Sequence, residues 1–140
     1  MIILDILKNK NIKIVGHKYA DFDAFVSGYL LEYILRRLKI NATFVLQDDF
    51  VDPYFKDIAK KIGFNYELNY GIDDNDVLFL VDHTDFYNNE IVGCFDHHPT
   101  IANIDVNYVN MNKTCCAKII YDYDYANIFD MFLWNERKWI

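Results

Sequence analysis

The sequence predicts an α/β fold, with an open, mostly parallel Rossmann-like sheet and helices on both of its faces. Strand-like and helix-like segments alternate along the first half of the chain, which is typical of β-α-β units. Two later runs, residues 77–81 and 91–95, carry no charged side chain, as expected of parallel strands that are covered on both faces. The 140 residues, 53% of them hydrophobic, suffice for one core, so we expect a single domain over residues 1–140.

The first 40 residues predict two helices and the strand between them. Residues 2–10 have the pattern of a short amphipathic helix, and residues 12–15 that of a strand, which Gly16 ends. Between residues 22 and 39 the apolar side chains recur at helical spacing. Basic side chains gather near the C-terminal end of this segment, where the helix dipole favours cations. The segment is therefore predicted to be a long helix.

A second strand and helix follow at once. Residues 42–46 predict the strand. Asp52 and Pro53 then begin a helix that runs to about Lys61, and Gly63 ends it in the manner of a C-cap. These elements complete a β-α-β-α order before the first apolar run.

The remaining chain predicts short strands and one more helix. Residues 65–68 predict an extended piece, and residues 104–109 an edge strand because polar and apolar side chains alternate there. After Thr114 the chain is predicted to be helical to about residue 130. Beyond it lies an aromatic tail that contains Phe132, Leu133, Trp134 and Trp139. This tail would cover the sheet edge that lacks a neighbouring strand, or pair with a second subunit.

Composition narrows the class of protein. The formal net charge of -7 excludes a broad basic surface for duplex nucleic acid. The three cysteines, Cys94, Cys115 and Cys116, are odd in number and lack zinc-like spacing, so we expect reduced thiols. With neither a basic leader nor an apolar run as long as a membrane span, the chain is expected to be cytoplasmic and without a membrane partner.

All four histidines lie in three short motifs, each at the end of a predicted strand. The motifs are His17-x3-Asp21-x-Asp23, Asp82-His83 and Asp96-His97-His98. In an open parallel sheet the loops at the carboxyl ends of the strands converge on one crevice. We therefore expect these side chains to meet in one site, although helix capping and loop polarity are the simpler alternative, and Asp23 could serve as an N-cap by itself.

The chemistry of the motifs favours a metal site. Mixed imidazole and carboxylate ligands suit manganese, cobalt or iron better than calcium or structural zinc, and manganese is the first choice. Two such ions that share a carboxylate can clamp both oxygens of an in-line phosphoryl displacement, and Asp82 is the natural shared ligand. Asp96 and His83 are better candidates for orienting the ligand imidazoles by hydrogen bonding.

These motifs resemble the DHH phosphoesterase superfamily, and more closely the N-terminal domain of the manganese-dependent, family II inorganic pyrophosphatases. The matching stretches cover most of residues 12–121. They are Gly16-His17-Lys18-Tyr19-Ala20-Asp21-Phe22-Asp23-Ala24, Leu80-Val81-Asp82-His83-Thr84-Asp85, Asp96-His97-His98-Pro99 and Thr114-Cys115-Cys116-Ala117-Lys118.

The resemblance implies roles for individual residues. His17, Asp21 and Asp82 would hold one of two divalent ions, manganese first, with cobalt or magnesium possible. The second ion would be held by Asp23, Asp82 and His97. The catalytic candidates are Asp82, as the ligand shared by both ions, and His98. His98 would contact phosphate or assist proton transfer. The substrate implied is pyrophosphate or another small phosphate-containing compound.

The resemblance also implies partners and parts that residues 1–140 are expected to lack. Relatives carry a further strand whose aspartate completes the second metal site, and a C-terminal domain that grips the substrate phosphates. They dimerise through the N-terminal domain, which implies a homodimer. Three hypotheses follow: a remnant that binds metal weakly, a module completed by a partner chain, or a catalytically silent metal-, nucleotide- or partner-binding module. A further enzyme hypothesis, hydrolysis of oligonucleotides or cyclic dinucleotides, predicts aromatic stacking near the site.

Overall fold

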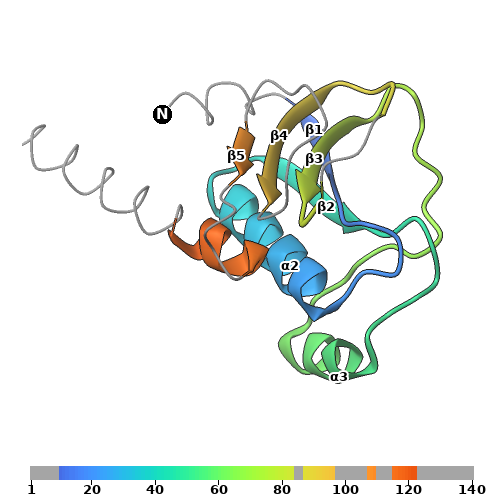
Figure 1. The fold of residues 1–140 in the computed structure, drawn as a ribbon, viewed down its shortest axis with the longest axis vertical. Coiled ribbons are helices and arrows are strands. Elements are labelled where there is room, and N and C mark those ends of the chain that lie inside the picture. The colour runs from blue at the N-terminus through green and yellow to red at the C-terminus, as the bar shows by residue number, and fades with distance from the viewer. Residues whose placement is uncertain (1–9, 84–86, 97–106, 110–114, 123–140) are drawn as a thin grey trace, which may run out of the picture.

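The computed structural model confirms the α/β fold class. It describes residues 10–83, 87–96, 107–109 and 115–122. Five strands form one sheet in the order β2-β1-β3-β4-β5, and every neighbouring pair is parallel (Figure 1). The strands are β1 (Asn11–Val15), β2 (Asn41–Val45), β3 (Val77–Val81), β4 (Ile91–Asp96) and β5 (Asn107–Val109).

The strand predictions are confirmed with small shifts of their ends. The two apolar runs are the central strands β3 and β4, and the alternating segment supplies the edge strand β5 at residues 107–109. The extended piece predicted at 65–68 pairs with the sheet only through one bridge, between Val45 and Glu67. The predicted N-terminal helix and the aromatic tail lie outside the described residues.

Helix α2 (Phe22–Arg37) begins where its capping residue dictates. Asp21 has an extended backbone, and its Oδ1 accepts the N–H of Ala24 at 3.0 Å, as an N-cap does. The helix ends near Leu38 with Arg36 and Arg37 in its last turn, two residues before the predicted end. The basic side chains therefore lie where the sequence placed them relative to the helix dipole.

Helix α3 (Pro53–Ile62) confirms both predicted caps. Asp52 accepts the N–H groups of Tyr54 and Phe55, and Gly63 ends the helix in the left-handed region with φ 72°. The ring of Phe55 stacks on that of Phe25 with centroids 4.8 Å apart, so α3 packs directly on α2.

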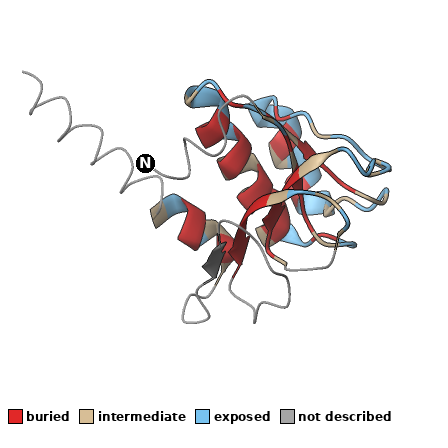
Figure 2. Ribbon diagram, turned by 90° about the horizontal axis from the view of Figure 1, so that it is seen from above, coloured by how far each residue is buried: buried red, intermediate tan, exposed pale blue. Residues whose placement is uncertain are grey.

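The helices that the structure describes share one face of the sheet. Buried side chains of α2, α3 and helical residues 116–122 form one cluster with alternate residues of the strands, including Ile14 and Phe79 (Figure 2). On the opposite face a smaller cluster packs under loop side chains. It comprises Val15, Val45, Leu78, Leu80 and Cys94, with Tyr70, Ile72 and Tyr87 against it. Helices on both faces were predicted, and among the described residues no helix covers this second face.

The strand order locates the crevice of the fold. The chain runs from β1 to β2 on one side and then returns to place β3 on the other side of β1. Such a reversal leaves the loops after β1 and β3 diverging to opposite sides, which opens a ligand crevice at the carboxyl ends of these strands. Loop residues after β1 and β3 are thus the first place to look for function.

Gly28 provides a test of the α2–β2 packing. A Cβ at this buried position would lie 2.4 Å from two ring atoms of Phe44, whose ring is fully buried. We expect Gly28→Ala to lower the urea midpoint of unfolding, because overpacking costs about 1–3 kcal/mol and outweighs the gain in helix propensity of about 1 kcal/mol.

The matched control is Gly71→Ala. Gly71 is exposed and has nothing within 4 Å of an added Cβ, so its urea midpoint should stay near that of the wild type. An unchanged midpoint for Gly28→Ala would contradict the close packing of α2 on β2.

Candidate metal centre

Three predicted ligands meet at the crevice between β1 and β3. Ligand atoms of His17, Asp21 and Asp82 all lie within 4.8 Å of one another. His17 follows β1 by two residues, Asp82 directly follows β3, and Asp21 caps α2. One side chain therefore comes from each of three elements whose ends converge.

The backbone sets the tautomer of His17. Its Nδ1 lies 2.8 Å from the carbonyl oxygen of Lys18, which can only accept, so Nδ1 carries the hydrogen. The other nitrogen, Nε2, faces Asp82 Oδ2 at 3.3 Å and Asp21 Oδ1 at 3.8 Å. A lone pair directed at two carboxylates requires a cation between them, and that cation is either a proton or a metal ion.

In the absence of metal, the cation between these groups is a proton on His17. The hydrogen bond between His17 and Asp82 raises the pKa of His17 to about 9, against the opposing effect of burial. The raised pKa contributes stability to the metal-free protein that is complete below about pH 6.5 and is lost as the pH rises through 9.

Asp82 is the buried member of the group. Its exposed fraction is 2%, and burial raises the pKa of its carboxyl to about 6, helped by the charges of Asp23 and Asp21 and opposed by His17. Its backbone has φ 60°, a left-handed conformation that is uncommon outside glycine. The Asp82 N–H donates to the carbonyl of Phe95 at 2.9 Å, which joins the ends of β3 and β4. Strain of this kind persists where the surrounding structure enforces it, often at functional sites.

Asp21 is the accessible member. Its side chain is 64% exposed, and the N-cap bond occupies only Oδ1. The carboxylate therefore stays open to solvent on one side while the helix holds its position, as a ligand that admits an ion from solution would.

Asp23 has a structural role that the motif did not reveal. Oδ2 accepts the N–H of Cys116 at 2.9 Å, and Oδ1 accepts that of Ala117 at 3.0 Å. These are the first amides of helical residues 116–122, so Asp23 caps that helix from a distance of 93 positions in the chain. Asp23 also acts on the pKa of Asp82, which places it beside the centre, and its role as a metal ligand stays a prediction.

His83 is held by protein groups on both ring nitrogens. Nδ1–H donates to the carbonyl of Val81 at 3.0 Å, and Nε2 accepts the Tyr87 hydroxyl at 3.0 Å. The ring meets that of His17 edge to face with centroids 6.4 Å apart. Both ring nitrogens thus bond to groups other than the predicted ligands, and the orienting role of His83 stays a prediction.

The third motif supplies three further predicted residues, of which only Asp96 is described by the structure. Asp96, the last residue of β4, is fully buried at the same end of the sheet as Asp82. His97 and His98 lie outside the described residues, so the roles predicted for them are untested.

Sequence reasoning missed the residues that support the histidines. The Tyr87 hydroxyl accepts a hydrogen bond from the side-chain amide of Gln47 at 3.1 Å, which extends the chain that begins at His83. The carbonyl of Lys18 fixes the His17 tautomer. A tyrosine four residues after His83 was a weak signal for this network, and a backbone carbonyl gives none.

The comparisons with known proteins agree with this site. A family model described as the DHH family, N-terminal domain, matches residues 11–133. The chain belongs to the DHH family. Membership indicates a phosphoesterase-type function, and DHH proteins are generally metal-dependent, which fits the His17, Asp21 and Asp82 group. No curated protein matches the chain. Among the described residues, no helix is long and apolar enough to span a membrane.

Metal binding should displace the His17 proton. Because the metal-free pKa of His17 is about 9, the ring is almost fully protonated at about pH 7.5, and a metal ion needs the bare nitrogen. We expect about one proton to be released per ion bound, measured by calorimetry with manganese in two buffers of different ionisation enthalpy.

The control for this measurement is His17→Asn, which removes the titrating group but keeps a polar side chain. Its manganese affinity should fall, and its proton release should drop toward zero. Equal proton release in the wild type and the variant would mean that His17 is not the group displaced.

Proposed function

We propose that this protein is a manganese-dependent phosphohydrolase that acts on pyrophosphate or another small phosphoanhydride or phosphoester. The observation that carries this proposal is Nε2 of His17, which faces the carboxylates of Asp82 at 3.3 Å and Asp21 at 3.8 Å in a chain of the DHH family. We also propose, from the resemblance alone, that Asp23, Asp82 and His97 hold a second ion and that His98 contacts phosphate.

The local charges favour a cation before an anionic substrate. Asp21, Asp23 and Asp82 gather in the crevice, and the proton on His17 offsets only part of their charge. A phosphate ester would be repelled there unless divalent ions reversed the sign of the field. When bound, such ions supply Lewis-acid polarisation and a bound water of lowered pKa.

The protein's own contribution is position. Asp82 keeps its carboxylate fixed through burial and a left-handed backbone, while the α2 N-terminus lies beside Asp21. The dipole of α2 attracts the carboxylate that caps this terminus. The chain itself thus supplies a fixed frame of carboxylates that would hold divalent ions.

The choice of manganese and the assembly remain part of the proposal. Imidazole and carboxylate donors suit manganese or cobalt, and magnesium is the alternative if oxygen ligands dominate. A homodimer, or a partner chain that completes the site, is proposed from the resemblance to the pyrophosphatases.

Asp82→Asn is the decisive variant. It keeps the size of the side chain and removes the buried charge that faces His17. We expect manganese affinity to fall by more than about 100-fold and phosphate release from pyrophosphate to fall to background, measured by calorimetry followed by addition of pyrophosphate. Asp57→Asn, at an exposed position of α3, is the matched control and should behave as the wild type.

The wild type separates the competing hypotheses. Manganese binding with phosphate release supports the hydrolase. Manganese binding without turnover of any phosphate compound would contradict the hydrolase and support a catalytically silent binding module. No binding at micromolar manganese would contradict both.

A second candidate function, hydrolysis of oligonucleotides or cyclic dinucleotides, is favoured by exposed aromatic side chains beside the metal centre. Tyr19 lies midway between His17 and Asp21 in the chain and is 73% exposed, and its ring meets that of Phe50 with centroids 6.1 Å apart. Phe22, which directly follows Asp21, packs against Tyr54 in the same way. Exposed rings of this kind are platforms on which bases stack.

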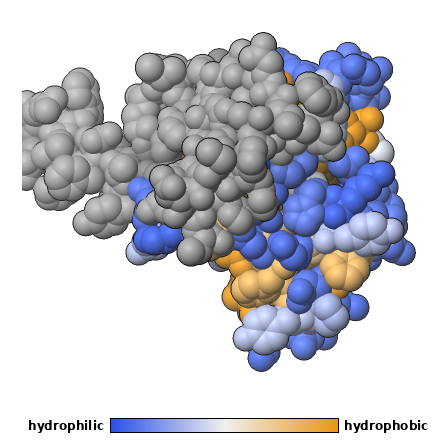
Figure 3. Space-filling view, viewed as in Figure 1, coloured by the Kyte–Doolittle hydropathy of each residue, from blue (hydrophilic) through white to orange (hydrophobic). Residues whose placement is uncertain are grey.

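The backbone of Tyr19 strengthens this candidate. Its φ of 54° is a left-handed value that a bulky residue rarely adopts, and the Tyr19 N–H donates to Asp48 Oδ2 at 2.9 Å to hold it. Figure 3 shows apolar surface gathered toward the α3 end of the molecule. A strained and exposed aromatic next to the ligands suits a binding role better than a packing role.

Tyr19→Ala tests the nucleotide substrate. We expect the KM for a linear dinucleotide to rise by about tenfold, since stacking contributes about 1–3 kcal/mol per base, while the KM for pyrophosphate stays the same. Tyr121→Ala, at an exposed position near the end of helical residues 116–122, is the control and should change neither value. Equal effects of Tyr19→Ala on both substrates would argue against base stacking.

A further inference from the structure

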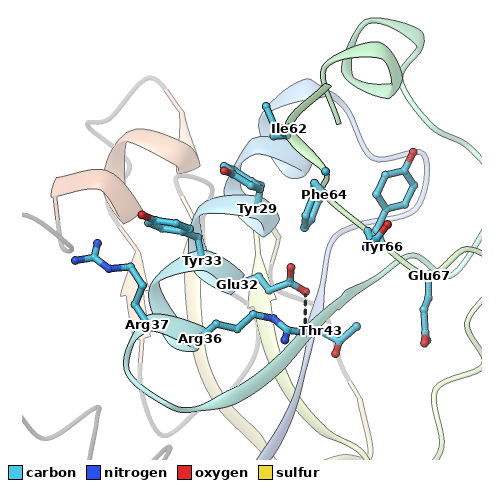
Figure 4. A pocket seen from close by; sticks show the side chains of 12 residues that line it. Tyr29, Glu32, Tyr33, Arg36, Arg37, Thr43, Ile62, Phe64, Tyr66 and Glu67 are labelled. Atoms are coloured by element: carbon cyan, nitrogen blue, oxygen red, sulfur yellow. Dashed lines mark ion pairs between the residues drawn. The ribbon is translucent and has the colours of Figure 1, made fainter. Parts of the chain in front are cut away.

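A pocket of about 760 Å³ lies away from the metal centre. It opens between the C-terminal half of α2, strand β2 and residues 62–67 (Figure 4). None of its described lining residues belongs to the His17, Asp21 and Asp82 group. Its central residue, Glu32, follows Asp21 by eleven positions along α2, a rise of about 16 Å. The pocket is therefore a separate feature of the molecule.

The pocket exists because the sheet edge is only partly paired. Residue Glu67 joins the outer side of β2 by one bridge at Val45, and its N–H donates to the carbonyl of Phe44. The N–H of Phe44 turns instead to Glu32 Oε1 at 3.0 Å. A side chain thus takes the place of a strand at this edge, and a hollow remains between β2 and the chain that leads to Glu67.

Glu32 presents an open acceptor to this hollow. The residue is 9% exposed, and Oε1 takes both the Phe44 N–H and the nearest contact with Arg36, at 3.8 Å. Among the described residues none donates a hydrogen bond to Oε2. Burial raises the pKa of Glu32, so additional donors would stabilise the ionised carboxylate. A ligand that offers N–H groups would supply them.

Aromatic rings line the hollow around Glu32. Tyr29 and Tyr33 stack with centroids 6.3 Å apart, and Phe64 meets Tyr29 edge to face at 5.1 Å. Tyr66 tilts against Phe64 on the far side (Figure 4). Charged and polar side chains complete the lining, namely Glu32, Arg36, Arg37, Thr43, Asn65 and Glu67. Aromatic walls of this kind suit a flat ring, and the polar groups can fix its orientation.

A cation stands at the outer end of the hollow. The guanidinium of Arg37 lies over the Tyr33 ring, 5.4 Å from its centroid, and no carboxylate among the described residues pairs with it. Figure 4 shows this side chain beyond Tyr33, at the opposite end of the pocket from Tyr66. Arg37 is exposed and can bind a phosphate group in a bidentate manner.

We propose that this pocket binds a guanine nucleotide, with the base against the aromatic rings, its N–H edge at Glu32 and its phosphate at Arg37. Guanine presents adjacent N–H donors on the edge that would face the carboxylate. Adenine presents a ring-nitrogen acceptor there, which Glu32 would repel. The site should therefore select guanine over adenine, and it does not depend on the proposed hydrolase function.

The test uses the full chain without metal, in EDTA, and titrates guanosine monophosphate, adenosine monophosphate and guanosine by calorimetry. We expect guanosine monophosphate to bind about tenfold or more tightly than adenosine monophosphate. Arg37→Ala should weaken guanosine monophosphate and leave guanosine unchanged. Absence of binding up to about 1 mM, or equal affinity for both monophosphates, would overturn the proposal.

Glu32→Gln is the variant that tests the carboxylate without loss of the fold. The Gln side-chain oxygen can still accept the Phe44 N–H, while the amide nitrogen brings a donor against the donors of guanine. We expect affinity for guanosine monophosphate to fall at least about tenfold at an unchanged melting temperature. Unchanged affinity would overturn the role of Glu32.

Two controls keep this test distinct from the metal centre. Lys39→Ala removes an exposed cation that is outside the pocket and should leave the affinity unchanged. Asp82→Asn should leave it unchanged as well, whether or not the variant binds manganese. A loss of nucleotide binding in Asp82→Asn would place the nucleotide in the metal centre and overturn the proposal.

Discussion

The contact between Asp82 Oδ2 and His17 Nε2, 3.3 Å across the ends of β3 and β1, is the interaction on which the candidate site depends. A carboxylate that is 2% exposed is costly to ionise, and two further acids nearby raise that cost. Because Nδ1 of His17 donates to the Lys18 carbonyl, only Nε2 can interact with the Asp82 carboxylate. Whatever cation sits between the two groups therefore decides both the local stability and the chemistry.

The neighbouring acids link the site to the packing of the helices. Asp21 caps α2, and Asp23, two residues later, caps helical residues 116–122. One motif thus anchors the N-termini of two helices beside Asp82. The hypothesis of helix capping and the hypothesis of metal ligation, which look like alternatives in the sequence, describe different lone pairs of the same carboxylates. A carboxylate has about four acceptor positions, so the two roles are compatible.

The sequence was sufficient for features that depend on local rules. Apolar runs gave the central strands, and Asp52 and Gly63 gave both ends of α3, because capping and burial are properties of short segments. The meeting of His17, Asp21 and Asp82 was predicted from their places at the carboxyl ends of parallel strands. The support of His83 by Tyr87, and the cap that Asp23 places on a distant helix, were beyond prediction because they depend on tertiary register.

Glu32 belongs to this second group, and it shows why a helix pattern cannot assign every polar residue. A charged residue in an amphipathic helix generally faces solvent, and nothing in the helix pattern distinguishes Glu32 from the others. In the structure it is buried because β2 lacks a full partner at Phe44 and needs an acceptor there. Helix α2 therefore carries a carboxylate for the metal crevice at its start and another for the sheet edge eleven residues later. Gly28 packs directly against Phe44 between these two positions, so the same contact of α2 with β2 fixes both carboxylates relative to the sheet.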